Sequence, residues 1–294
     1  MTNRLELNWK LDGFVDEQRY YCSETPIDVN NLPAPKAILL SSDRSYTDTD
    51  IEVGKTYYVA VASVRDGVEK ISEVRLVRAV GGDEHWDKVV ALLHFDGDFS
   101  DLKGGTWVAS GASATIDTSI IKFGTGSLKA VGGSSLNATI PSLGTDDFTI
   151  EFNIYPLLVN GSWQRYFAIG GFTKPGSFYM LNVGASNPPR VLIGMNSNFN
   201  LSSQGPETTL NMLAWNHVAV TRENGTMRIF INGLLRENIT WPTFDINETF
   251  AQINDEVVDG SNAFNAHYDE LRITKGVARY TENFTPPDSP FLNY

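Results

Sequence analysis

The sequence has almost no cysteine: Cys22 is the only one among 294 residues. No intrachain disulfide and no cysteine-based zinc site can form, so packed apolar cores must stabilise the fold. Long apolar runs are also missing, and the first ten residues carry the charges of Arg4, Glu6 and Lys10. No stretch reaches the roughly 18 apolar residues that a membrane-spanning helix needs. We therefore expect neither a cleaved signal peptide nor insertion into a membrane.

Basic residues are scarce as well. The 23 Lys and Arg residues are outnumbered by 35 Asp and Glu residues, and the formal net charge is -12. Nucleic-acid binding depends on clustered Lys and Arg that neutralise phosphates, so we expect no nucleic-acid partner. The acidic surface is compatible with solvation and with a divalent cation.

Helical periodicity is lacking too, whereas short strand patterns separated by polar turns recur along the whole chain. In residues 1–80, Leu5, Leu7 and Trp9 alternate with polar residues, and the apolar run 57–64 ends at an Asp-Gly turn. The order of these pieces resembles a fibronectin type III module, through the Trp9 strand, Tyr20-Tyr21, residues 25–28 and residues 54–61. The usual first strand of such a module is short or absent here.

Residues 81–87 are polar and glycine-rich at their start, which is typical of a linker. The apolar run 89–95 then predicts a strand buried between two sheets. In residues 148–155, Phe148, Ile150, Phe152 and Ile154 alternate with polar residues, and we expect Pro156 to end this strand. A second domain therefore occupies residues 88–294.

Residues 215–233 predict a β-hairpin, because two runs rich in β-branched residues meet at Asn224-Gly225. Together with residues 92–97, 123–128, 148–156 and 268–287, this hairpin resembles the laminin G-like branch of the concanavalin A-like lectin sandwiches. That resemblance implies an all-β protein in which a small fibronectin type III-like sandwich precedes a concanavalin A-like jelly roll. The family mostly binds sugars or other ligands, and some of its members are glycanases.

The amino-acid sequences of residues 94–97 and 279–284 are similar to those in domains of tailed-bacteriophage virion proteins. This resemblance implies a tail, fibre or capsid-decoration protein, located in the virion, present in several copies and in contact with other virion proteins or a host cell-surface glycan.

A metal site is suggested by Asp96, Asp98, Asp101 and Asp269. If residues 267, 269, 271 and 273 share one strand face, Asp269 points toward the core and needs a partner. Calcium is one partner, and many lectin-like sandwiches carry it. Backbone N–H donors are the alternative, because Asp-Gly-Asp is also ordinary turn chemistry.

Sugar binding needs an exposed aromatic ring beside groups that bond hydroxyls. The candidates are Trp163, Tyr166, Tyr179 and Trp241, with Asn196, Asn198 and Asn200 as polar neighbours. These aromatics also fit a purely structural role, in which they pack loops onto the sandwich. A third hypothesis is therefore that the protein is a structural module that binds no ligand.

Glycanase chemistry needs two carboxylates about 5 to 5.5 Å apart for retention or about 6.5 to 9.5 Å apart for inversion, and a Glu-X-Asp-X-Glu strand pattern is missing. We therefore expect no catalytic residues. The leading hypothesis is a non-enzymatic structural or adhesion protein of the virion. The alternative is a polysaccharide-degrading enzyme or its carbohydrate-binding appendage.

Overall fold

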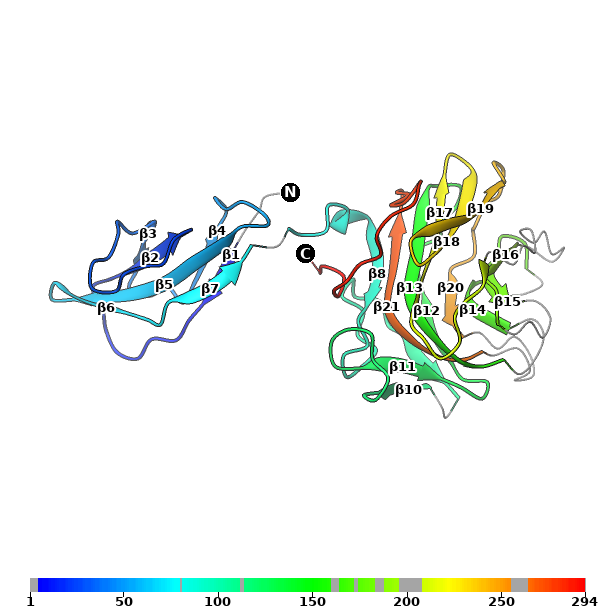
Figure 1. The fold of residues 1–294 in the computed structure, drawn as a ribbon, viewed down its shortest axis with the longest axis horizontal. Helices are drawn as coiled ribbons and strands as arrows, with labels where there is room; N and C mark the ends of the chain where they lie inside the picture. The colour runs from blue at the N-terminus through cyan, green and yellow to red at the C-terminus, as the bar shows by residue number, and fades with distance from the viewer. Residues whose placement is uncertain are drawn as a thin grey trace. The chain divides into compact units, whose positions relative to one another are not determined.

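The computed structural model describes residues 5–79, 81–111, 114–159, 164–171, 174–182, 188–195, 208–254 and 264–293. The chain divides into two compact units, Met1–Glu84 and His85–Asn293. Every regular element in the described residues is a strand except the 3-10 turn Trp86–Lys88 (η1), so the all-β prediction is confirmed (Figure 1). No helix in this part of the chain is long and apolar enough to cross a membrane.

The first unit contains two small antiparallel sheets. One pairs β1 with β4, and the other has the order β3-β2-β5-β6, with β7 also paired to β5. The bounds are β1 Leu5–Asn8, β2 Glu17–Ser23, β3 Ala37–Leu40, β4 Ser45–Asp48, β5 Thr56–Arg65, β6 Val68–Ile71 and β7 Arg75–Arg78.

Alternation of apolar and polar residues explains these strands. Burial follows the same period of two in β1, where Leu5 and Leu7 are half-buried and their neighbours are exposed. The β5–β6 turn uses Asp66 and Gly67 at φ values of 50° and 76°, which suits the primed turns of tight hairpins. Tyr20, Tyr57 and Val59 lie in the core of this unit.

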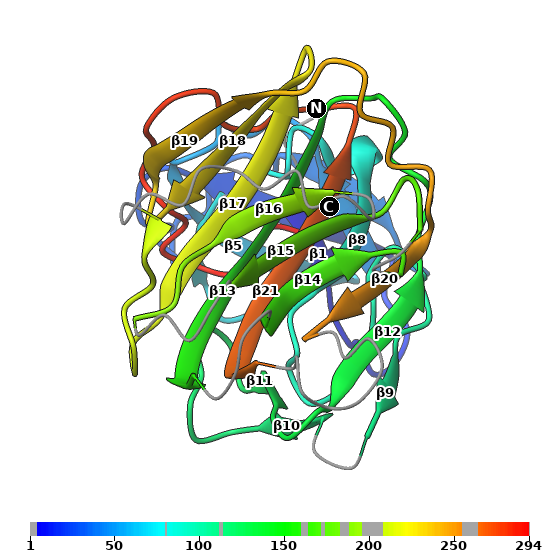
Figure 2. The same ribbon diagram turned by 90° about the vertical axis from the view of Figure 1, so that its right-hand side faces the viewer.

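The second unit is a sandwich of two antiparallel sheets. The large sheet has the order β10-β11-β21-β13-β17-β18-β19 with β8 paired to β21, and the second sheet has the order β16-β15-β14-β20-β12-β9. The bounds are β8 Val89–Leu93, β9 Val108–Ser110, β10 Ala114–Asp117, β11 Ser127–Ala130, β12 Ser135–Thr139, β13 Phe148–Leu158, β14 Gln164–Ile169, β15 Phe178–Asn182, β16 Leu192–Met195, β17 Asn216–Glu223, β18 Thr226–Ile231, β19 Leu234–Thr240, β20 Phe250–Ile253 and β21 Asn265–Lys275. Figure 2 looks onto the second sheet, with the large sheet behind it.

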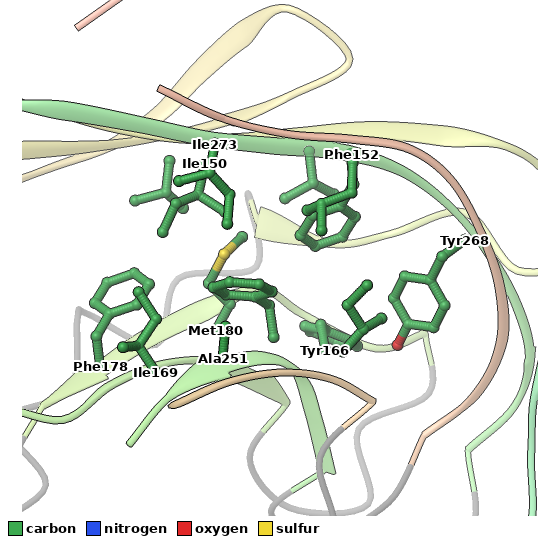
Figure 3. Close-up of a cluster of buried hydrophobic side chains, with 14 of the residues drawn as sticks. Ile150, Phe152, Tyr166, Ile169, Phe178, Met180, Ala251, Tyr268 and Ile273 are labelled. Carbon is green, nitrogen blue, oxygen red and sulfur yellow. The ribbon is translucent and has the colours of Figure 1, made fainter. Parts of the chain in front are cut away.

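The core of this unit lies between the two sheets. Ile150 and Phe152 of β13 point from the large sheet toward Ile169 and Met180 of the second sheet (Figure 3). This is the packing that the alternation in residues 148–155 predicts. The predicted hairpin is also confirmed, because β17 and β18 pair antiparallel around Asn224-Gly225.

Pro156 does not end β13, which was the expectation from the sequence. The strand continues to Leu158, and the register with β21 shifts between Pro156 and Leu158. Such an irregularity accommodates a residue that cannot donate a ladder hydrogen bond.

The C-terminal segment, residues 276–291, runs along the outer face of the large sheet, which faces away from the second sheet (Figure 1). We call this segment the C-terminal strap. Phe284 donates its backbone N–H to the carbonyl of Gly233 and stacks on Tyr280, with ring centroids 3.6 Å apart. The N–H of Phe291 bonds Glu270 Oε2 at 2.7 Å. The strap therefore buries the polar residues at one end of the outer face.

Candidate functional site

The outer face of the large sheet carries a pair of aromatic rings beyond the residues that the strap contacts. Tyr155 lies near the end of β13 and points outward, because Ile154 beside it is in the core. Trp215 precedes β17, and its ring packs edge-to-face on Tyr155 with centroids 5.6 Å apart. Both side chains are half-buried. We call this pair the aromatic ledge.

The ledge is held in position by neighbouring elements. Trp215 Nε1 donates a hydrogen bond of 3.0 Å to the carbonyl of Ile121. On the other side, His267 of β21 lies opposite Tyr155 in the register, with ring centroids 6.3 Å apart. Two fixed rings with one partly exposed surface can bind an apolar ligand face at little entropic cost.

Polar side chains continue the same cross-strand row. Lys129 of β11 lies opposite His267, and Thr115 of β10 lies opposite Lys129. Lys129 Nζ is 3.9 Å from Asp117 Oδ2, and both side chains are partly exposed. These groups provide hydrogen-bond donors and acceptors beside the ledge.

His267 is buried, and this burial lowers its pKa although Asp117 partly offsets the effect. The ring is therefore neutral near pH 7. Its Nδ1 lies 3.1 Å from the hydroxyl oxygen of Ser127.

Asp269 lies on the same outer face, opposite Asn153. Its Oδ2 accepts the backbone N–H groups of Lys122 and Phe123 at 2.9 and 3.0 Å, while its buried Oδ1 has no hydrogen-bond partner among the described residues. Burial raises the pKa of Asp269 to about 7, although the two N–H donors act in the opposite direction. The backbone donors that were the alternative to a metal are therefore present.

The predicted orientation of Asp269 is wrong. Leu271 and Ile273 are in the core as expected, but the core residue before them is Tyr268. The register with β13 shifts beside Glu270, which has a φ of 54°. This bulge reverses the alternation, so Asp269 points outward whereas Leu271 points inward.

The four predicted metal ligands do not converge. Asp101 accepts N–H groups of Leu92 and Lys103 and the indole N–H of Trp107. Asp98 is exposed and caps Ser100. Across the described residues, no group of three His, Cys, Asp or Glu side chains could hold a metal ion.

Asp96 and Asp269 remain as a smaller candidate set. Asp96 Oδ1 accepts the N–H groups of Thr125 and Gly126. Asp96 and Asp269 therefore bind the same loop, residues 122–126. Calcium binding stays a prediction, with Asp96 and the unpartnered Oδ1 of Asp269 as the carboxylate donors.

The predicted aromatic platform is wrong for its two tyrosines. Tyr166 lies in the core and donates to the carbonyl of Arg190 at 2.9 Å. Tyr179 is 2% exposed, donates to the carbonyl of Gly171 and lies beneath the guanidinium of Arg165. Both match the structural role that aromatic residues have in cores.

Trp241 is half-buried against the core, and its backbone N–H bonds the carbonyl of Gly225. The other candidates lie outside the described residues: Trp163, Asn196, Asn198 and Asn200. The aromatic ledge was not predicted, although Tyr155 belongs to the outward-facing set of a clear period-two segment and Trp215 opens the hairpin.

Glu151 is a second fully buried carboxylate on the outer face. Its Oε1 bonds Arg272 Nε and Nη2 at 2.9 and 2.8 Å, and its Oε2 bonds His217 Nε2 and the hydroxyl of Tyr280. Burial alone raises the pKa of Glu151, but Arg272 and His217 outweigh it and hold the pKa at about 2. The strap closes over this cluster through Tyr280 and Phe284.

The family model described as the concanavalin A-like lectin/glucanases superfamily matches residues 131–281. The chain belongs to this superfamily. The match includes β13, the β17–β18 hairpin, β21 and both rings of the ledge. No curated protein sequence matches this lectin-like chain.

A solved structure with the same fold is domain 4 of AbnA, an extracellular arabinanase from Geobacillus stearothermophilus, in complex with arabinotriose. It is 18% identical with a TM-score of 0.51, and the alignment covers 65% of this chain and 94% of that one. A second solved structure is that of botulinum neurotoxin type C, a toxin whose cell entry depends on interaction with two ganglioside molecules. It is 18% identical to this chain, with a TM-score of 0.49. That alignment covers 66% of this chain and only 49% of the toxin chain.

Proposed function

We propose that this protein is a non-enzymatic glycan-binding protein, and that the aromatic ledge of its lectin-like sandwich contacts the sugar. The observation that carries this proposal is the fixed Tyr155–Trp215 pair on the part of the outer face beside Lys129 and Thr115. The arabinanase domain that shares the fold was solved with arabinotriose.

The chemistry of a pyranose fits this arrangement. The C–H groups of one sugar face pack on aromatic carbon, while hydroxyls need donors and acceptors at the rim of the ring. Lys129 supplies a donor, Asp117 an acceptor and Thr115 a hydroxyl that does both. These three side chains are partly or fully exposed.

The arrangement of the carboxylates supports a binding role over hydrolysis. A glycosidase needs an acid and a base or nucleophile that both reach the glycosidic bond. Glu151 is fully buried and paired with Arg272, and Asp269 is fully buried beneath the 122–123 backbone. A polysaccharide-degrading enzyme, or its carbohydrate-binding appendage, remains the competing function.

The resemblance of residues 94–97 and 279–284 to tailed-phage proteins supports a place in a virion. We propose a tail, fibre or capsid-decoration protein in several copies, located in the virion, with other virion proteins as partners. Electron microscopy of intact particles with a labelled antibody tests this placement, and particles without label would refute it.

The glycan proposal is tested with a Trp215→Ala variant on a glycan array and on host capsule and cell-wall polysaccharide. We expect retention of the glycan to fall at least about tenfold, because the ledge loses its larger ring. Trp241→Ala is the matched control, since it removes a half-buried indole away from the ledge and should retain binding. Polymer shortening by the wild type would instead establish the enzyme.

A further inference from the structure

The β1–β4 sheet of the first unit has an edge on which no strand of the described residues lies. β1 pairs with β4, and no other strand of the described residues pairs with β1. The N–H of Trp9 bonds the carbonyl of Arg44, which continues the same register. Because backbone groups alternate in direction along a strand, those of Asn8 and Lys10 point away from β4. This edge is therefore a template for another strand.

A groove of 970 Å³ lies beside this edge. It is lined by β1, by the middle of β5 and by β6 and β7, and its floor includes Val59, Val61 and Val77. Leu7, Val61 and Val77 pack on the core of the unit yet are only half-buried. The groove therefore leaves apolar surface that an added strand would bury.

Cations outnumber carboxylates at the groove although the chain as a whole has a charge of -12. Two exposed carboxylates, Glu6 and Glu73, line it together with the exposed cations Lys10, Lys70 and Arg75. None of the three makes an ion pair within the described residues, whereas Lys36 and Lys55 on the same unit do. An acidic occupant would complement this local charge.

We propose that this groove binds an extended, acidic segment of another protein, which adds to the free edge of β1 as a strand. Lys70 pairs with Ser63 and Arg75 with Val59, so both cations leave the same sheet face as Val61 and Val77. The side chains of the segment that point at this face are therefore apolar over the two valines and acidic beside the two cations. Strand addition of this kind takes its affinity from the backbone ladder and its specificity from alternate side chains.

A second copy of the chain does not suit the groove as the occupant. Residues directly opposite in an antiparallel ladder point to the same face, so pairing β1 with a second β1 would place both β5-containing sheets on one side. Each would then occupy the volume of the other. The occupant must be a segment that has no sheet of its own packed beneath it.

The test uses the full chain and a synthetic peptide with the repeat Val-Thr-Glu-Thr, which places valine and glutamate on one face of the strand, and binding is followed by calorimetry. We expect measurable binding that weakens with salt, and slower amide hydrogen exchange at Asn8 and Lys10. The same peptide with lysine in place of glutamate should bind at least about tenfold more weakly. Equal binding of both peptides, or unchanged exchange at β1, would overturn the proposal.

Two variants of β7 separate the groove from general charge. Arg75→Glu should weaken binding at least about tenfold, whereas Arg78→Glu on the same strand, outside the groove, should leave it unchanged. Equal effects of the two would refute the site.

N-methylation of the peptide amides that point toward β1 should abolish binding. N-methylation of the alternate amides, which point away from β1, should not. A dimer in light scattering that Arg75→Glu dissociates would assign the groove to a second copy and refute the present occupant.

Discussion

Glu151 shows how a single residue connects the sheet to the strap. Its carboxylate is fully buried, yet it remains charged because Arg272, His217 and Tyr280 all contact it. Breaking such a buried pair from one side leaves the other charge without a partner, which costs more than the pair contributes. The cluster therefore makes the strap and the sheet depend on the same ionised group.

Glu151→Gln should lower the free energy of unfolding by about 3 kcal/mol at pH 7, because Arg272 loses its charged partner. The folded pKa of about 2 lies below the ordinary value of 4.5, so the contribution is present above pH 4.5 and lost as the pH falls toward 2. Urea unfolding at a series of pH values measures this. The exposed Glu282→Gln is the control, and an unchanged acid limb in Glu151→Gln would contradict the assignment.

Calcium binding at Asp96 and Asp269 is tested by thermal unfolding in excess CaCl₂ and in EDTA. We expect calcium to raise the melting temperature of the wild type, since a ligand of the native state stabilises it. Asp269→Asn should remove this increase, and Asp98→Asn, in an exposed turn, should keep it. A wild type that melts at the same temperature in both buffers would exclude the site.

At the scale of elements, the bulge at Glu270 decides which side chains of β21 face outward. Because of this bulge, Asp269 points to the outer face and Leu271 points to the core. The carboxylate of Glu270 accepts a hydrogen bond from the backbone N–H of Phe291 and forms another with Nδ1 of His94. One residue at a positive φ thus joins β21, the end of β8 and the strap.

The strap also depends on the close approach of backbone at Gly233. A Cβ there would overlap the carbonyl oxygen of Phe284, and the φ of 76° already disfavours a side chain. Gly233→Ala should therefore destabilise the second unit by about 3 kcal/mol and expose the strap to protease. Gly276→Ala has a similar φ of 84° with open space around it, so it should cost only about 1 kcal/mol. Equal costs would show that the contact with Phe284 is unimportant.

At the scale of the whole molecule, each unit has its own apolar core. The first is built around Tyr20 and Tyr57, and the second lies between the two sheets of the sandwich. Independent cores predict independent unfolding. Calorimetry should show two transitions, and residues 85–293 expressed alone should keep the second of them. A single transition that disappears on truncation would contradict this.

The sequence predicted strands where the period of two is strong. Residues 148–155 and the Asn224-Gly225 hairpin follow from side-chain alternation and turn chemistry, which are local properties. Prediction failed at Pro156 and at Asp269, because a register shift is decided by neighbouring strands. For the candidate site, the sequence predicted an aromatic sugar-binding surface but not the residues that form it. Its rings, Tyr155 and Trp215, come from segments 60 positions apart.

Local patterns therefore determined the all-β class and the strands themselves, since each depends on residues a few positions apart. Which outward face stays open depends on how distant segments pack. The strap covers Glu151, the second sheet's tyrosines are buried, and the ledge remains partly exposed. A face is exposed or covered according to which distant segment packs on it, and alternation along one strand carries no information about that partner.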